Sequence, residues 1–302
     1  MVYIQLRSNL MSKLFLMLWF ILPVMVSCGS GNQEQRDIVT EWIGKKLIIP
    51  DSLQFQIGDL PIEYDFNDAD YKIVTYIDST GCTGCKMRLK EWDNFICSLK
   101  CSSDTVRVNF VMIVSHVNTE YLNEILKQKN FLHPITIDNE GIFYKSNHLP
   151  RNNKYQTFLL TGDNRIVAIG NPINNPKIKD VYENIILGSQ HEAAIETYDI
   201  NIASPNPIHV MGVVSPGDSV FVNYQLINKS SQNITVQDIV TSCHCVAAVS
   251  DVSTVLPDGM INIDATYKAD SVSQQIYKYV DVYFKERQNP VRLHLCGFIK
   301  QH

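Results

Sequence analysis

Hydrophobic residues in the first half of the chain follow two patterns. Short runs rich in β-branched residues predict strands, and apolar residues repeating every three to four positions predict helices. The expected strands are residues 71–77, 106–114, 134–137, 157–160 and 165–169. The expected helices are residues 83–100, 120–129 and 177–187. Strands separated by helices indicate an α/β sheet with helices on its faces.

The second half of the chain has a different pattern, because apolar and polar residues alternate there with a period of two. The expected strands are residues 220–227, 234–239, 260–266, 276–284 and 291–299. Tight-turn residues stand between them, and no further helix is indicated. Short strands at this spacing favour a β-sandwich. The polar stretch 188–192 marks the change, which predicts one domain at residues 37–188 and another at residues 196–302.

The first 28 residues carry the features of an export signal. Residues 14–26 form an uncharged apolar run after Lys13, and this run is too short for a comfortable transmembrane helix. It ends in Met25-Val-Ser-Cys28, which resembles the lipobox of bacterial lipoproteins. The resemblance implies cleavage before Cys28, lipidation of its thiol and a lipid anchor in the cell envelope, periplasmic or surface-facing. The alternatives are an ordinary secretory peptide with a chance cysteine and an uncleaved anchor.

The composition and the cysteine count bear on two questions: which class of partner the chain binds, and whether all its thiols can be paired. The formal net charge is −5 with a pI near 5.9, so there is no basic surface charge to favour nucleic acid as a partner. If Cys28 of the eight cysteines is lipidated, an odd number remains, and at least one thiol stays unpaired or binds a metal. Export places these thiols in an oxidising compartment.

A Cys-x-x-Cys motif provides the main candidate chemistry. Cys82 and Cys85 follow an expected strand and open an expected helix, where backbone N–H groups and the helix dipole favour a thiolate. This context predicts thiol–disulfide exchange without a cofactor, whereas a structural disulfide or half of a zinc site are the alternatives. Cys97 and Cys101 are four residues apart on one helical face, and either a disulfide between them or a role in the core remains open.

At these residues the first half resembles the thioredoxin-like superfamily, in particular its envelope-anchored thiol–disulfide oxidoreductases, over about residues 60–188. The resemblance implies that Cys82 attacks a disulfide and that Cys85 resolves the mixed disulfide. Three positions depart from the family pattern. Gly81 stands where a Trp usually precedes the first Cys, Tyr155 stands at the cis-proline position, and Tyr76 replaces a buried acid.

The second half contains a Cys243-His244-Cys245 segment that follows an expected strand. Together with Asn228 and a terminal glycine-containing strand, it resembles a bacterial family called domain of unknown function 1573, over about residues 200–300. His244 replaces the usual Gly. The resemblance implies an immunoglobulin-like sandwich without a settled chemistry.

Cys243 and Cys245 leave three readings open. In the first reading they are two buried side chains or a strained disulfide. In the second they are a redox pair, and in the third they are ligands of a soft metal such as Cu(I). In the metal reading, His244 assists, and His294 or Cys296 joins if the last strand lies beside the segment. His133, His148 and His209 have no ligand spacing and are expected at the surface or in hydrogen bonds.

These observations predict an α/β thioredoxin-like fold plus an all-β immunoglobulin-like sandwich in a membrane-anchored lipoprotein. The expected function is thiol–disulfide exchange, and the expected partners are thiols or disulfides of envelope proteins or of its own second domain. A non-catalytic binding or structural lipoprotein is the alternative from another class. Soft-metal binding through Cys243, His244 and Cys245 is the third possible function.

Overall fold

The computed structural model describes residues 30–78, 87–102, 105–188, 202–272 and 274–300. The predicted export signal with Cys28, and the pair Cys82 and Cys85, lie outside the described residues. The chain forms two units, Met1–Lys45 and Lys46–His302. In the first unit, helix α2 spans Ser30–Trp42. Among the described residues, no helix combines the length and the apolar character that a membrane crossing requires.

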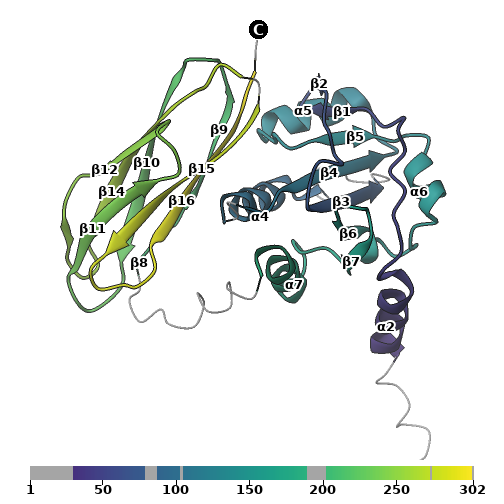
Figure 1. Ribbon diagram of the computed structural model, residues 1–302, viewed down its shortest axis with the longest axis horizontal. Coiled ribbons are helices and arrows are strands. Elements are labelled where there is room, and N and C mark those ends of the chain that lie inside the picture. The colour runs from purple at the N-terminus through teal and green to yellow at the C-terminus, as the bar shows by residue number, and fades with distance from the viewer. Residues whose placement is uncertain (1–29, 79–86, 103–104, 189–201, 273, 301–302) are drawn as a thin grey trace, which may run out of the picture. The chain divides into compact units, whose positions relative to one another are not determined.

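The α/β part of the second unit is built on a seven-stranded sheet with the order β2-β1-β5-β4-β3-β6-β7 (Figure 1). Its strands are β1 (Phe55–Ile57), β2 (Leu60–Ile62), β3 (Tyr71–Asp78), β4 (Val108–Ser115), β5 (Ile135–Ile137), β6 (Thr157–Thr161) and β7 (Ile166–Ile169). β3, β4 and β5 are parallel, whereas β6 and β7 run antiparallel to their neighbours. β3 is therefore a central strand, paired on both sides.

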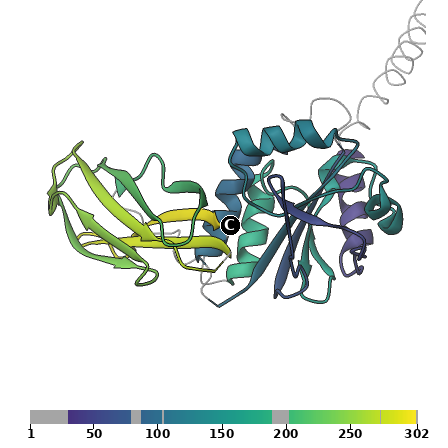
Figure 2. The same cartoon turned by 90° about the horizontal axis from the view of Figure 1, so that it is seen from above.

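Helices cover the sheet because its central strands are apolar on both faces. They are α4 (Leu89–Ser102), α5 (Thr119–Gln128), α6 (Ile142–Asn147) and α7 (Pro176–Leu187), with a 3₁₀ turn η1 at Asn153–Tyr155 (Figure 2). Trp92 and Phe95 of α4 share one core cluster with Tyr182 of α7 and with Ile73 and Phe110 of the strands. α4 is thus anchored by its buried face to the sheet and to α7.

The remaining described residues form a sandwich of two sheets. One sheet has the order β12-β14-β10-β8, and the other has the order β13-β11-β15-β16-β9. The strands are β8 (Ile202–Ala203), β9 (Ile208–Val214), β10 (Ser219–Asn228), β11 (Ile234–Thr241), β12 (Val246–Ser250), β13 (Thr254–Val255), β14 (Met260–Lys268), β15 (Gln274–Phe284) and β16 (Val291–Ile299). Alternate residues of both sheets point inward and fill one core.

Two polar or small residues hold this sandwich in register. The buried side-chain amide of Asn228 donates to the carbonyl oxygens of Gln232, Val255 and Leu256, so it joins two turns at one end of the sheets. Gly297 lies where β16 meets β9, and a Cβ there would be 3.1 Å from the Gly212 carbonyl oxygen. A side chain at this position would require the β9 backbone to shift by a few tenths of an ångström.

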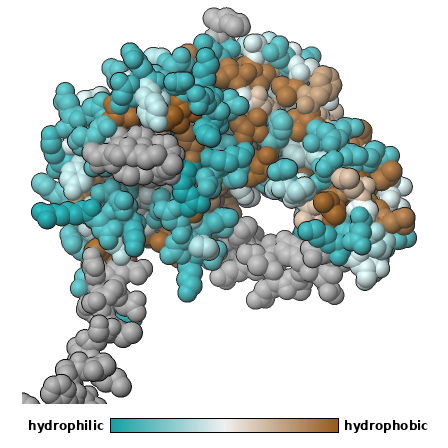
Figure 3. Space-filling view, turned by 180° about the vertical axis from the view of Figure 1, so that it is seen from behind, coloured by the Kyte–Doolittle hydropathy of each residue, from teal (hydrophilic) through white to brown (hydrophobic). Residues whose placement is uncertain are grey.

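Hydrophobic residues on the face shown in Figure 3 form separate patches among hydrophilic ones. Among the described residues, the most exposed large hydrophobic ones are Phe221 and Val249, with 77% and 64% of their surface accessible. Both belong to the β12-β14-β10-β8 sheet. Singly exposed apolar residues of this kind are normal in soluble domains.

The predicted fold class is confirmed. The expected strand 71–77 is β3, and the expected helix 177–187 is α7, which begins at Pro176. The structure adds elements that the periodicity did not indicate, notably β1, β2, α6 and β9.

Candidate functional site

The described residues on either side of the Cys-x-x-Cys motif are the carboxyl end of β3 and the start of α4. β3 ends at Asp78 and α4 begins at Leu89. A cleft of about 620 Å³ is lined by both flanks and by the loop that precedes β6. Its lining includes Thr75–Asp78, Arg88, Arg151–Lys154, Gln156, Thr157, Asn171 and Asn174. The motif therefore occurs in the sequence between two segments that line one cleft.

The cleft is rich in positive charge and amide groups. Arg88 forms an ion pair with Glu91 at 3.1 Å, and it donates to the Asn174 Oδ1 at 2.6 Å. Arg151 and Lys154 line the same cleft, in which Asp78 is the acidic residue. Cations beside a thiol favour its ionised form.

Two of the positions that depart from the thioredoxin-like pattern, Tyr76 and Tyr155, are described, and Tyr76 lines this cleft. The Tyr76 N–H donates to the Gln156 carbonyl oxygen at 2.9 Å, so Tyr76 touches the loop that contains Tyr155. No peptide bond of the described residues is cis. The Tyr76 hydroxyl is 2.7 Å from the Ser115 Oγ, and burial raises the pKa of the phenol. Tyr76 is therefore a neutral hydrogen-bonding group where the family has an acid.

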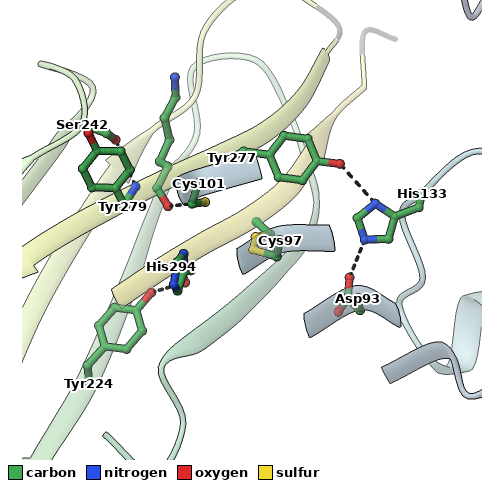
Figure 4. The surroundings of a disulfide bond; sticks show 11 residues. Asp93, Cys97, Cys101, His133, Tyr224, Ser242, Tyr277, Tyr279 and His294 are labelled. Carbon is green, nitrogen blue, oxygen red and sulfur yellow. Dashed lines mark hydrogen bonds and ion pairs between the residues drawn. A yellow bond between two sulfur atoms is a disulfide. The ribbon is translucent and has the colours of Figure 1, made fainter. Parts of the chain in front are cut away.

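A second cysteine site joins the α/β part to the sandwich. Cys97 of α4 forms a disulfide with Cys296 of β16, across a sequence separation of 199 residues and a Cα–Cα distance of 6.3 Å. The alternative of a Cys97–Cys101 disulfide, which the sequence left open, is therefore wrong, because Cys97 is bonded to Cys296. Two thiols on one helical face both point at β15 and β16, and the strand supplies the partner (Figure 4).

Cys101 lies beside this disulfide. The Cys101 thiol donates to the Lys278 carbonyl oxygen at 3.4 Å, and the sulfur atoms of Cys97, Cys101 and Cys296 lie within 4.8 Å of one another. We call these three residues the thiol cluster. All three are at least 98% buried, and Tyr277 and Tyr279 of β15 pack against them.

A buried hydrogen-bond chain runs beside the thiol cluster. His133 Nε2 is 2.9 Å from Asp93 Oδ1, and His133 Nδ1 is 3.1 Å from the Tyr277 hydroxyl (Figure 4). Burial raises the pKa of Tyr277, so its phenol keeps its proton and donates to Nδ1. The Asp93 carboxylate then accepts from Nε2–H, which assigns the tautomer of a neutral imidazole. Burial also lowers the pKa of His133, although Asp93 opposes this shift.

These buried histidines predict acid sensitivity. Burial, aided by the Arg292 charge, lowers the pKa of His294 to about 4, and that of His133 is lowered as well. The unfolded chain then binds more protons than the folded chain below the ordinary histidine pKa of about 6.5, so stability falls as pH drops. His294 alone is expected to cost about 2 kcal/mol of unfolding free energy between pH 8 and pH 5.

Urea unfolding at several pH values between 8 and 5 measures this effect. The His294→Gln variant is expected to lose less stability over this pH range than the unchanged chain. His148 and His209 are exposed, and His148→Gln serves as the matched histidine substitution at the surface. A pH-independent unfolding free energy in the unchanged chain would contradict the prediction.

Cys243 and Cys245 form a disulfide in the turn between β11 and β12, with a Cα–Cα distance of 5.2 Å. Both are half-buried and His244 between them is exposed. Ser242 fastens this turn to β15, because its N–H donates to the Tyr279 carbonyl oxygen at 3.0 Å. Of the three readings of this segment, the structure contains the disulfide, while its redox and metal roles remain predictions. Cys296 is bonded to Cys97 instead of joining the segment.

The thiol cluster is the site that sequence reasoning missed. Two local signals pointed toward it. Cys97 and Cys101 share a helical face, and Cys296 alternates with the inward-facing Leu293 and Leu295 of β16, which turns its side chain outward. What the sequence lacks is any sign that these two faces meet.

Comparisons with known proteins find one matching family and several matching solved structures. A family described as "Protein of unknown function (DUF1573)" matches residues 203–299. No curated protein sequence matches the chain. Among solved structures, a protein of unknown function from Porphyromonas gingivalis W83 matches with 12% identity and a TM-score of 0.29, over 33% of this chain and 46% of that one. The chain therefore spans less than half the length of that protein.

Two further solved structures cover the α/β part. The thioredoxin domain of a thiol-disulfide oxidoreductase from Bacteroides vulgatus matches with 10% identity and a TM-score of 0.38, over 48% of this chain and 97% of that one. A putative thiol:disulfide interchange protein DsbE from Chlorobium tepidum matches with 12% identity and a TM-score of 0.36, over 48% of this chain and 96% of that one.

Proposed function

We propose that the chain is an envelope lipoprotein, anchored through Cys28, that performs thiol–disulfide exchange with Cys82 and Cys85. The observation that carries the proposal is the place of the motif in the sequence, between the carboxyl end of the central strand β3 and the first turn of α4. The sequence predicts that Cys82 opens a helix, and a thiol at a helix N-terminus is stabilised as the thiolate, which is the attacking species in disulfide exchange.

The exchange proceeds in two steps that balance without a cofactor. The Cys82 thiolate attacks one sulfur of a substrate disulfide, forms a mixed disulfide and releases the other substrate sulfur as a thiolate. The Cys85 thiolate then attacks Cys82 Sγ and releases the second substrate thiolate. The substrate gains two electrons, and the protein is left with a Cys82–Cys85 disulfide.

The side chains that line the cleft indicate which class of substrate it can bind, and this class is consistent with the proposal. Arg88, Arg151 and Lys154 offer positive charge, and the asparagine side chains offer hydrogen bonds to a peptide backbone. The substrate class proposed is thus a protein thiol or disulfide of the envelope, with acidic residues near its cysteine. The second half of the same chain, through Cys243 and Cys245, is a further candidate substrate.

Reduction of a fluorescent glutathione-disulfide derivative by the reduced protein tests the proposal. Cys82→Ser is expected to lower the rate at least about 100-fold, because the attacking thiolate is gone. Cys85→Ser is expected to accumulate the mixed disulfide, which mass spectrometry detects as one adduct. The double variant Cys243→Ser/Cys245→Ser is the matched control and should keep its rate. An unchanged rate in Cys82→Ser would refute the mechanism.

One observation favours a second candidate, a non-catalytic binding lipoprotein. The loop before β6 has no cis peptide bond, and Tyr76 occupies the place of the family's buried acid. The redox potential of the Cys82–Cys85 pair separates the candidates. A potential below about −300 mV, as structural disulfides have, supports binding, whereas a higher potential supports exchange.

A further inference from the structure

The thiol cluster has the composition of a soft-metal site. It holds three sulfur atoms that lie within 4.8 Å of one another, and no other group of three or more potential ligands comes this close among the residues that the structure describes. Thiolates are the ligands that soft ions such as Cu(I) and zinc select. The three residues are buried, so an ion among them would be shielded from water.

The fold holds the three sulfur atoms together from two directions. Cys97 and Cys101 are one helical turn apart on α4, and Cys296 extends from the outward face of β16. α4 is fastened to this face by Arg292, whose Nη1 donates to the Cys101 carbonyl oxygen at 2.7 Å. Tyr277 and Tyr279 pack around the cluster. A metal here would be held by a preformed frame rather than by a flexible loop.

We propose that the reduced thiol cluster binds one Cu(I) ion through the sulfur atoms of Cys97, Cys101 and Cys296. A dithiol reductant first transfers two electrons and two protons to the Cys97–Cys296 disulfide, which gives two thiols, and is itself oxidised to a disulfide. Binding then releases up to three protons as the thiols become thiolate ligands. The proposal does not depend on Cys82 and Cys85.

The number of ligands favours Cu(I) over Zn²⁺. Structural zinc sites use four protein ligands in a tetrahedron, and catalytic zinc sites keep an open position for water. The cluster offers three sulfur atoms and is closed to solvent, so it provides neither arrangement. Cu(I) is stable with three thiolates in a plane.

Two cations and two carboxylates lie near the site. Three thiolates and Cu(I) carry a net charge of −2, which is costly to bury without nearby cations. The Lys100 Nζ lies 4.6 Å from the centre of the Tyr277 ring that packs on the cluster. Arg292 lies beside Cys101, although Asp281 neutralises part of its charge at 2.7 Å. Asp93, the other nearby acid, is bound by His133.

The pair Cys243 and Cys245 is the competing thiol site, and it differs in two respects. It offers two sulfur atoms, and both residues are half-buried beside the exposed His244. An experiment must therefore remove this pair, together with Cys82 and Cys85, before it assigns copper to the cluster. The resulting full-length variant, Cys82→Ser/Cys85→Ser/Cys243→Ser/Cys245→Ser, is called the cluster-only protein.

Competition for Cu(I) against bathocuproine disulfonate tests the proposal, with protein reduced by dithiothreitol and freed of it anaerobically. The cluster-only protein is expected to bind one Cu(I) per chain, with X-ray absorption showing three sulfur neighbours. Adding Cys101→Ser is expected to weaken binding at least about 100-fold. Circular dichroism of this variant tests whether it is still folded. Cys28→Ser is the matched cysteine replacement outside the cluster, and it is expected to retain binding.

Three outcomes would overturn the proposal. The first is a cluster-only protein that takes no copper from the competitor. The second is a folded Cys101→Ser variant that binds as tightly as its parent. The third is preferential binding of Zn²⁺ over Cu(I) in parallel titrations. Because the cluster-only protein lacks Cys82 and Cys85, its result is independent of any failure of the exchange activity.

Discussion

Removing the Cys97–Cys296 disulfide is expected to lower the free energy of unfolding by about 5 kcal/mol, which follows from the loop of 199 residues that it closes. In the chain-entropy description, a cross-link stabilises by restricting the unfolded chain, and the effect grows with the logarithm of the loop length. Cys296→Ala is the variant of choice, since it breaks the bond without leaving a buried hydroxyl. Urea unfolding under non-reducing conditions measures the difference.

The Cys243–Cys245 disulfide provides a matched control within the same chain. It spans a sequence separation of 2, so the same relation predicts a stabilisation of only about 1.5 kcal/mol. Cys243→Ala/Cys245→Ala should therefore cost far less than Cys296→Ala. Equal losses in the two variants would show that loop closure does not govern the contribution of either bond.

Replacing Arg292 with Met is expected to cost about 3–5 kcal/mol, because it leaves the buried Asp281 carboxylate without its cation. Arg292 binds both oxygens of Asp281 at 2.8 and 2.7 Å, and its guanidinium lies 3.7 Å from the centre of the Tyr279 ring. It also holds the last turn of α4 through the Cys101 carbonyl oxygen. Methionine preserves much of the volume but replaces none of these contacts.

Chemical unfolding of Arg292→Met and Arg107→Met compares the loss of unfolding free energy at a buried ion pair with that at an exposed one. Arg107 forms ion pairs with Asp68 and Asp70, but its side chain is 60% exposed, so Arg107→Met should cost far less than Arg292→Met. Adding Asp281→Asn to Arg292→Met is expected to recover part of the loss. The prediction fails if the two arginine variants are equally stable.

Local patterns in the sequence were sufficient to predict a helix or strand whose own residues show which of its faces are buried. The apolar run of β3 and β4 identified the central strands, because a strand buried on both faces needs no alternation to be recognised. β1 and β2 have three residues each, which is too short for a period to be visible. β9 contains Gly212 at a φ of 77°, and the register shift opposite it interrupts the alternation.

The candidate sites divide in the same way. The Cys-x-x-Cys motif is recognised from its neighbours along the chain, so the sequence identified it without tertiary information. The Cys97–Cys296 bond was beyond this reasoning, because it joins residues 199 positions apart. Helical spacing indicates which way Cys97 and Cys101 face, but only the packing of α4 against β15 and β16 places Cys296 opposite them.

The contact of α4 with β16 limits how the two halves of this chain can be separated. A fragment ending at residue 188 would expose Cys97 and Cys101 and lose the Arg292 side chain that holds the end of α4. Such a fragment is expected to be prone to intermolecular disulfides between copies. The halves therefore do not behave as interchangeable modules, and a homologous sandwich grafted onto the α/β part would need its own cysteine and arginine at the positions of Cys296 and Arg292.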